Sequence, residues 1–431
     1  MEKLGHKDNE TIMKEAFNRS AQNILVNEPH FYKPPGLLVG LEMETSVIDH
    51  CGQAVGQPLR DRIVDILPYV SCELGASQLE WRTDPIMVAG EDGLEKLILQ
   101  ARQRDVEVHN AVRLYDGWVL RSGTNPFVNA DEIVRTDKPK YRMVPDFHNQ
   151  NRQRQDTDIS RNGHIVSVGD AAVVSLLNSL QCNCQATDFA DAVDKANRSL
   201  MIGPMTVALS ANAGLLYGKD TGLADLRMLA WERSHDTRNT REIAVNKALR
   251  VGLPDRYLTD LEDYFDRIAE HPFILFDPDH ALQIGIGLFW QDTRIKFIGN
   301  AVVVEFRPTS IQPTVEEDLA VMMFYLGRLQ WSQDYREELT PIDTVRKQRN
   351  LAMNEGITPF LKILPDEIMK AKIALIEAGV NQVELEKLFR ILWNRIDTGL
   401  TPVDITRQKR EKAKRQGLPE KDVLLRAFGA G

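Results

Sequence analysis

Cysteine is scarce in this sequence. Its 431 residues include 4 cysteines, and no two of them have the Cys-x-x-Cys spacing of a redox or zinc motif. So few cysteines cannot form the disulfide scaffold on which small secreted proteins depend. The motifs G-x-x-x-x-G-K-[ST] and H-E-x-x-H are also missing, and Gly285-Ile-Gly287 lacks the third glycine of a dinucleotide fingerprint. These absences exclude a P-loop enzyme and disfavour a zinc protease or a dinucleotide-binding protein.

Long hydrophobic runs and an excess of positive charge are absent too. The longest apolar stretch, residues 200–217, is interrupted by Pro204, Ser210 and Asn212, so we expect it to be buried in a core. The first residues, MEKLGHKD, lack the apolar centre of a secretory signal. With 53 Lys and Arg against 62 Asp and Glu, the net charge of −9 does not suit a protein that coats nucleic acid or an anionic membrane. We therefore expect a cytoplasmic globular protein that has neither as a partner.

The order of strand-like and helix-like segments indicates the fold class. From residue 37 to about residue 329 the two kinds alternate irregularly, without a run of βαβ units, which is typical of an α+β domain. We expect helices at 11–26, 312–335 and 365–396, and we divide the chain into an N-terminal helical extension (1–36), a single catalytic domain (37–400) and a basic C-terminal tail (401–431).

The segment LLVGLEMETSVID, residues 37–49, is predicted to be a strand with two different faces. Alternation places Val39 and Leu41 on one face and Glu42 and Glu44 side by side on the other. Two glutamates on one face of so apolar a strand indicate a functional site. The alternative is an edge strand whose polar face is solvated.

Two further segments repeat this pattern. In AVVVEFRP, Glu305 and Arg307 share one face, and in LQCNCQA, Gln181 and Asn183 share the face opposite to the two cysteines. The cysteines are expected to lie in the core. The alternatives are an exposed ion pair for the first segment and the polar face of an outer strand for the second.

Glu73 and Glu80 are separated by a glycine-containing turn that could fold one back beside the other, although both could instead face solvent. If the glutamates of these segments converge, two carboxylates about 4 Å apart repel by roughly 4 kcal/mol at an effective dielectric near 20. Such a group takes up protons unless cations neutralise it. Carboxylate oxygens suit Mg²⁺ or Mn²⁺, and Arg307 could stabilise a transferring phosphoryl group. The residues therefore predict metal-assisted phosphoryl chemistry.

Five motifs in order along residues 37–330 resemble those of the second glutamate–cysteine ligase family, which comprises carboxylate–amine ligases with a glutamine-synthetase-like fold. Gly40-Leu-Glu42-Met-Glu44 is similar to its G-x-E-x-E strand, and Arg121 to Phe127 is similar to its G-T-H-P loop. The others are Glu73-x4-Gln78-x-Glu80-x2-Thr83, Ala208 to Asn212 with Gly218 to Gly222 and Arg227, and Asp292 to Lys296 with Val304 to Arg307.

The resemblance implies a fold, a set of ligands and a reaction. The fold is a curved antiparallel sheet with helices packed on its outer face. In the reaction, ATP phosphorylates a carboxylate, usually the γ-carboxylate of L-glutamate, and an amine then attacks the acyl phosphate to form an amide. The implied site residues are Glu42, Glu44, Glu73, Glu80 and Glu305 as ligands of Mg²⁺ or Mn²⁺, Gln181 and Asn183 for metal and nucleotide, Arg294 and Arg307 at the phosphates, and Arg227 at the substrate carboxylate or the phosphates.

The sequence also departs from the family pattern. Gln181 and Asn125 stand where relatives have histidines, and Thr309 and Ser310 stand where an aspartate often follows the E-x-R motif. These changes leave the glutamates intact but leave the amine open, cysteine being the family default and another amino acid the alternative. A homo-oligomer is compatible with the sequence.

A basic run, RQKREKAKR at residues 407–415, lies in the C-terminal tail. Such a run is typical of a solvated helix or a frayed end, although it could close over an anionic substrate or bind an acidic partner. Two other functions therefore stay open: a binding protein that acts through this tail on a ligase-like domain without turnover, and a guanidino-kinase-like phosphotransferase.

Overall fold

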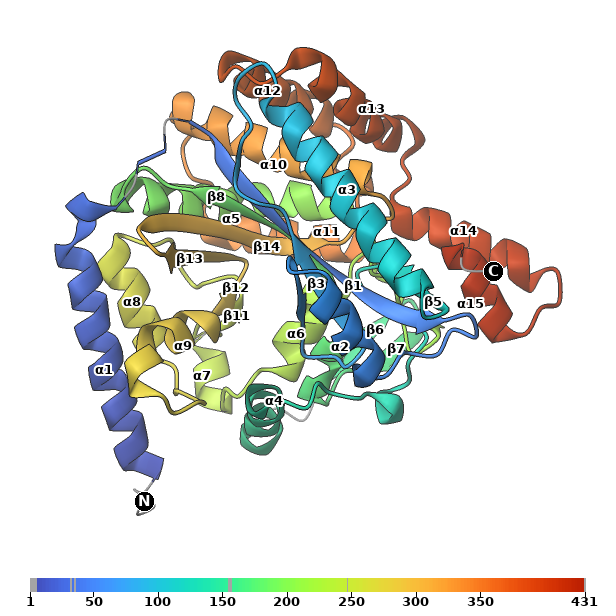
Figure 1. Cartoon of the computed structure of the whole chain (residues 1–431), viewed down its shortest axis with the longest axis horizontal. Helices are drawn as coiled ribbons and strands as arrows, with labels where there is room; N and C mark the ends of the chain where they lie inside the picture. Colours follow the sequence, from blue (N-terminus) through green and yellow to red (C-terminus); the bar gives the residue numbers. More distant parts are fainter. Residues whose placement is uncertain (1–5, 32, 35, 154–156, 246, 430–431) are drawn as a thin grey trace.

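The structure, a computed structural model, describes residues 6–31, 33–34, 36–153, 157–245 and 247–429. Within these residues an antiparallel sheet of eight strands lies at the centre of the molecule (Figure 1). Its order is β13-β14-β8-β1-β3-β2, and β4 and β5 pair with the two ends of β1. The strands are β1 (Leu38–Asp49), β2 (Val70–Cys72), β3 (Gln78–Arg82), β4 (Ile86–Met87), β5 (Gly117–Leu120), β8 (Ser179–Gln185), β13 (Thr293–Ile298) and β14 (Ala301–Ser310).

The register of the sheet brings the predicted polar residues onto one face. β1 lies between β8 and β3, and β8 lies between β1 and β14, so both are interior strands. The alternatives in which these two segments form an edge or outer strand are therefore wrong. The facing residues are Glu42 and Gln181, Glu44 and Glu80, Glu305 and Asn183, and Arg294 and Glu305.

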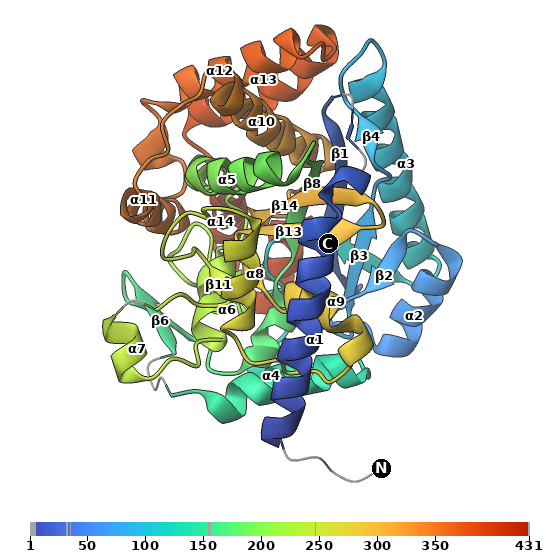
Figure 2. The same cartoon turned by 90° about the vertical axis from the view of Figure 1, so that its left-hand side faces the viewer.

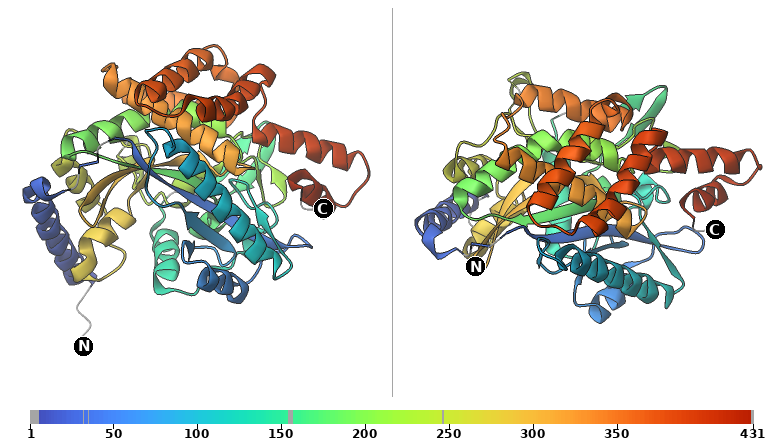
Figure 3. Two further views of the ribbon diagram at one scale, coloured as in Figure 1. Left: turned by 45° about the horizontal axis from the view of Figure 1, so that its top comes forward. Right: turned by 90° about the horizontal axis from the view of Figure 1, so that it is seen from above.

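The other face of the sheet packs against helices, and this packing fixes the direction of the polar side chains. Val39 and Leu41 of β1 and the two cysteines of β8 are fully buried, as the alternation predicts. Phe306 of β14 stacks on Tyr325 of α10, with 4.0 Å between the ring centroids. Figure 3 shows the helices over this face of the curved sheet. Among the helices that contribute to this core are α3 (Gly93–Arg113), α5 (Phe189–Ser210), α10 (Val315–Asp334), α12 (Leu364–Glu377) and α13 (Gln382–Thr398).

Two helix predictions need correction. The helix predicted at 365–396 is two helices, α12 and α13, because Gly379 adopts a positive φ of 85° and Asn381 caps the start of α13. The first helix, α1 (His6–Val26), begins earlier than the predicted 11–26. The apolar stretch 200–217 is buried as expected, with Pro204 inside the helix α5.

The two ends of the chain form helices that lie far apart. Met13 and Phe17 of α1 are buried in a core cluster with residues of α8 and α9, and Figure 2 shows α1 lying across this side of the molecule. Residues 1–5 of the predicted extension lie outside the described residues, and the division into extension, domain and tail stays a prediction.

No helix in the described part of the chain has the length and apolar character needed to cross a bilayer. The remaining elements are α2 (Gln57–Ile66), α4 (Pro139–Asn151), α6 (Arg227–Ser234), α7 (Thr240–Ala244), α8 (Leu261–Ala269), α9 (Ala281–Gly287), α11 (Ile342–Glu355), α14 (Pro402–Lys414) and α15 (Glu420–Phe428), with the short strand pairs β6 (Asp158–Arg161) and β7 (His164–Ser167), β9 (Leu215–Leu216) and β10 (Lys219–Asp220), and β11 (Val251–Gly252) and β12 (Trp290–Gln291).

Candidate functional site

A cavity of about 270 Å³ lies against the polar face of the sheet. We call it the acidic cavity, because four glutamates from β1, β3 and the segment before β3 line one part of it. Interior strands hold these side chains on a rigid scaffold, which is the usual arrangement for a catalytic or binding site. The predicted site residues that line the cavity are Glu42, Glu44, Glu73, Glu80, Gln181, Arg294 and Arg307.

In the acidic part of the cavity, the pKa values of two glutamates are raised. Burial, followed by repulsion from the neighbouring Glu44, raises the pKa of Glu73 to about 7. Burial also raises the pKa of Glu80 well above its usual value, followed by repulsion from Glu73, Glu42 and Glu44. The turn between β2 and β3 thus brings Glu80 back toward Glu73. A bound cation would relieve this repulsion.

These pKa shifts predict a dependence of stability on pH. Because the pKa of Glu73 rises from 4.5 to about 7, the folded protein binds a proton that the unfolded chain releases, so stability should fall between these pH values. In the absence of divalent cations, Glu73→Gln should therefore be more favourable to stability at pH 8 than at pH 4, by about 3 kcal/mol. Urea unfolding at the two pH values measures this difference.

The matched control is Glu95→Gln, an exposed position on α3, which should change stability equally at both pH values. Addition of Mg²⁺ should reduce the advantage of Glu73→Gln at pH 8. An effect of Glu73→Gln that is the same at pH 4 and pH 8 would contradict the raised pKa of this carboxylate.

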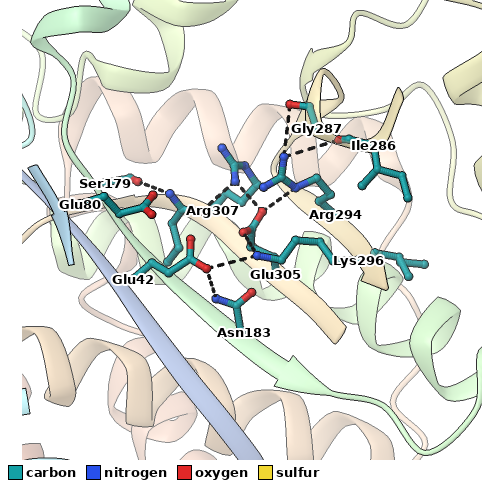
Figure 4. A network of polar contacts seen from close by, with 12 residues as sticks. Glu42, Glu80, Ser179, Asn183, Ile286, Gly287, Arg294, Lys296, Glu305 and Arg307 are labelled. Atoms are coloured by element: carbon teal, nitrogen blue, oxygen red, sulfur yellow. Dashed lines mark hydrogen bonds and ion pairs between the residues drawn. The ribbon is translucent and has the colours of Figure 1, made fainter. Parts of the chain in front are cut away.

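Beside the glutamates, a cluster of cations surrounds Glu305 (Figure 4). The fully buried Glu305 accepts from Arg294 Nε at 2.7 Å and from Arg307 Nη1 at 2.5 Å through Oε2, and from Lys296 Nζ at 2.5 Å through Oε1. Burial alone would raise the pKa of Glu305, but the three cations hold it well below its usual range. Here Glu305 therefore positions two arginines at the cavity, and its predicted role as a metal ligand stays a prediction.

Lys296 is a functional candidate that the sequence reasoning missed. Its ammonium group also lies 3.2 Å from Glu42 Oε1, so it links Glu42 of β1 to Glu305 of β14. The signal was present, since Lys296 stands two residues after Arg294 on β13 and therefore shares its face. Asn183 Nδ2 donates to the same oxygen of Glu42 at 2.9 Å. Asn183 thus orients Glu42 and is not among the residues that line the cavity.

Gln181 and Arg227 hold the arginine side of the site. Gln181 donates to Glu44 at 3.0 Å and accepts from Arg307 Nη1 at 2.8 Å, so it joins the acidic and basic parts. Arg227, at the start of α6, is buried behind the cavity, where its Nη2 donates to the carbonyl oxygen of Arg307 at 2.7 Å. The structure thus brings Arg227 next to the site but does not place it among the lining residues.

Aromatic side chains form another wall of the cavity, the aromatic wall, which no pattern in the sequence indicated. Trp231, His235 and Trp290 line the cavity there, with the two indole rings 5.8 Å apart and the ring of Trp231 5.9 Å from the Arg307 guanidinium. Burial, followed by the nearby His148 and Arg250, lowers the pKa of His235 well below its usual value, so its imidazole is neutral. Lys140 and Tyr141 of α4 complete this side.

The other recognised motifs hold loops behind the site. Asn212 Nδ2 donates to the carbonyl oxygen of Ile311 at 2.7 Å, and Ser310 donates to the buried Asp225 at 2.6 Å. The basic run of the C-terminal tail forms part of helix α14. Its Arg407 pairs with Asp220 at 2.8 Å, so this cation is engaged by the G-x-D-T-G motif of the same chain.

Comparison with known proteins places the chain in a family. A protein of Rubrobacter xylanophilus named "Putative glutamate--cysteine ligase 2-3" is 27% identical over 205 residues, which is 46% of this chain and 50% of that relative. The match thus spans about half the length of this curated relative. Two solved structures share the fold: a glutamate–cysteine ligase of Francisella tularensis in complex with AMP, and a bifunctional glutathione synthetase of Pasteurella multocida.

The first of these has a TM-score of 0.58 at 14% identity and covers 93% of this chain and 89% of that one. The second has a TM-score of 0.54 at 12% identity and covers 99% of this chain and 53% of that one. A curved antiparallel sheet of the glutamine-synthetase-like type, predicted from the motifs, is therefore confirmed. The model of the family described as glutamate-cysteine ligase family 2 matches residues 38–416, which is most of the chain. On this evidence the protein is a member of glutamate–cysteine ligase family 2.

Proposed function

We propose that the protein is an ATP- and Mg²⁺-dependent carboxylate–amine ligase that activates the γ-carboxylate of L-glutamate. One observation carries the proposal: a row of glutamates and a pair of arginines face the same cavity from neighbouring strands. Family membership supports it, and so does the AMP complex of the structurally similar Francisella ligase.

The residues of the acidic cavity fit Mg²⁺. Its four glutamates, Glu42, Glu44, Glu73 and Glu80, provide only carboxylate oxygens as ligands, which Mg²⁺ prefers. The raised pKa values of Glu73 and Glu80 show that their ionised forms are unfavourable here, and a bound cation would stabilise those forms. In the described part of the chain no three Asp, Glu, His or Cys side chains already stand close enough to hold a metal, so these side chains would draw together around it. Mn²⁺ has the same donor preference. When bound, the metal would bind phosphate oxygens and offset their charge.

The arginines would act on the phosphoryl group itself. Arg307 and Arg294 are held by the buried Glu305, so their guanidinium groups would stabilise charge on the γ-phosphoryl group without reorganising. The aromatic wall would exclude water while the acyl phosphate awaits the amine. The amine stays open between cysteine and another amino acid, since Gln181 and Asn125 replace family histidines.

Phosphate release tests the proposal. The protein is incubated with ATP, Mg²⁺ and L-glutamate, with and without a panel of amines that includes L-cysteine, and products are identified by mass spectrometry. We expect release that requires an amine, with an amide product. Phosphate transfer to a guanidinium compound would instead indicate a kinase-like enzyme. If the protein binds ATP but releases no phosphate with L-glutamate and any of the amines, glutamate is not its carboxylate substrate. If it does not bind ATP, the result favours the binding protein that acts through the C-terminal tail.

A further inference from the structure

A second cavity lies beside the first and has about twice its volume, about 550 Å³ against about 270 Å³. It is enclosed by the turn after β1 (residues 52–56), the loop 126–134, residues 175–176 and the C-terminal helix α15. Figure 1 shows α14 and α15 beside the end of β1 and the strand β5. The volume is that of a site for a small molecule.

The two cavities share a wall but no residues. In the segment 74–78, Leu74 and Gln78 line the acidic cavity while the two residues 76 and 77 line the second cavity. In the segment 174–177, the outer residues 174 and 177 line the acidic cavity, and residues 175 and 176 line the second cavity. The two segments are joined by a hydrogen bond, in which Gln78 Nε2 donates to the carbonyl oxygen of Leu177 at 2.7 Å. A molecule in the second cavity would therefore not occupy the proposed ligase site.

The second cavity has a largely apolar interior. Its lining includes the side chains of Val55, Phe127, Val128, Ile133, Leu176 and Leu424. Burial of an apolar ligand against such a lining is favourable, because it removes apolar surface from water.

Two opposite charges stand at the rim of this cavity without pairing. Lys421 of α15 and Glu132 are both exposed lining residues, and among the described residues no ion pair joins Lys421 to any acid. Glu132 accepts from the backbone and side chain of Asn129 through Oε2 alone, at 2.9 and 3.0 Å, which leaves Oε1 for a ligand. A zwitterion with an apolar body matches both charges and the interior, whereas a simple carboxylate or amine matches one charge only.

We propose that this cavity is a second ligand site, separate from the acidic cavity, for an apolar zwitterion of the size of a dipeptide. The carboxylate would lie at Lys421 and the ammonium group at Glu132. The site stands on its own contacts and does not depend on the ligase activity.

Binding of L-leucyl-L-phenylalanine to the full-length protein tests this site by isothermal titration calorimetry. The titration is repeated in the presence of AMP and L-glutamate, and binding to the second cavity should be the same in both. We expect saturable binding that is at least tenfold weaker for the N-acetyl dipeptide and for the C-terminal amide, because each lacks one charge. Absence of binding, or equal binding of the three compounds, would overturn the proposal.

Variants locate the bound peptide. Lys421→Gln should weaken binding at least tenfold, while Lys409→Gln, an exposed lysine on α14 outside the cavity, should not. Ala54→Trp places a large ring at the exposed rim and should abolish binding, with thermal unfolding and AMP binding unchanged to show an intact fold. Undiminished binding to Lys421→Gln and Ala54→Trp would place the peptide elsewhere and overturn the assignment.

Discussion

Replacing Arg307 by lysine should lower kcat for amine-dependent phosphate release by about 10²–10³-fold. Lysine keeps the positive charge beside Glu305, so we expect the protein to fold. It cannot reproduce the planar guanidinium that here reaches Glu305 at 2.5 Å and Gln181 at 2.8 Å through one nitrogen and leaves the rest of the group for a phosphate. Steady-state kinetics with saturating ATP, glutamate and amine measure the loss.

The control for this substitution is Arg102→Lys. Arg102 on α3 forms an ion pair with Glu316 at 2.6 Å, and its side chain is 52% exposed, so the same chemical change occurs far from the cavity. We expect its kcat to be unchanged. A normal kcat for Arg307→Lys, in a protein that turns over, would show that Arg307 does not contact the reacting phosphoryl group.

Glu305→Gln should destabilise the fold by about 3–5 kcal/mol, because a neutral amide would leave Arg294, Arg307 and Lys296 without the carboxylate they share. The lowered pKa of Glu305 has the same origin. The stability that it provides is present at neutral pH and is lost as pH falls through the folded-state pKa. Urea unfolding of wild type and variant at pH 7 measures the difference.

Two further variants test whether the lost stability comes from the buried cations that Glu305→Gln leaves without a carboxylate. Glu316→Gln, which breaks the exposed pair with Arg102, should cost less than about 1 kcal/mol. Adding Lys296→Met to Glu305→Gln should recover part of the lost stability, since one uncompensated cation is removed. If Glu305→Gln were no more destabilising than Glu316→Gln, the buried cluster would contribute nothing to the fold.

Much of the site could be predicted from strand alternation. Glu42 and Glu44 share a face because neighbouring side chains of a strand point to opposite sides, and the apolar residues between them must enter the core. The same reasoning placed Gln181 and Arg307 on the polar face of their strands. Alternation could not distinguish an interior strand from an edge strand, since that depends on which strands pair, and in this fold β1 has partners on both sides.

Some local structure escaped prediction for a different reason. The break between α12 and α13 lies within a continuous apolar pattern, and a single glycine with a positive φ and an asparagine cap decide it. Helical periodicity continues across such a break, so the pattern alone merges two helices into one.

By itself, the sequence determined the α+β class, the family and the faces of the strands that carry the glutamates, because these follow from short-range periodicity and from motifs within single segments. Only the tertiary structure decided which charged and aromatic side chains lie next to those glutamates. Lys296 and two arginines surround Glu305, and Trp231 and Trp290 form part of the aromatic wall of the cavity. The cavity at the C-terminal helix α15 likewise depends on contacts between distant segments. Such contacts arise when helices and loops pack over the sheet, and their geometry depends on the whole core, which no local pattern encodes.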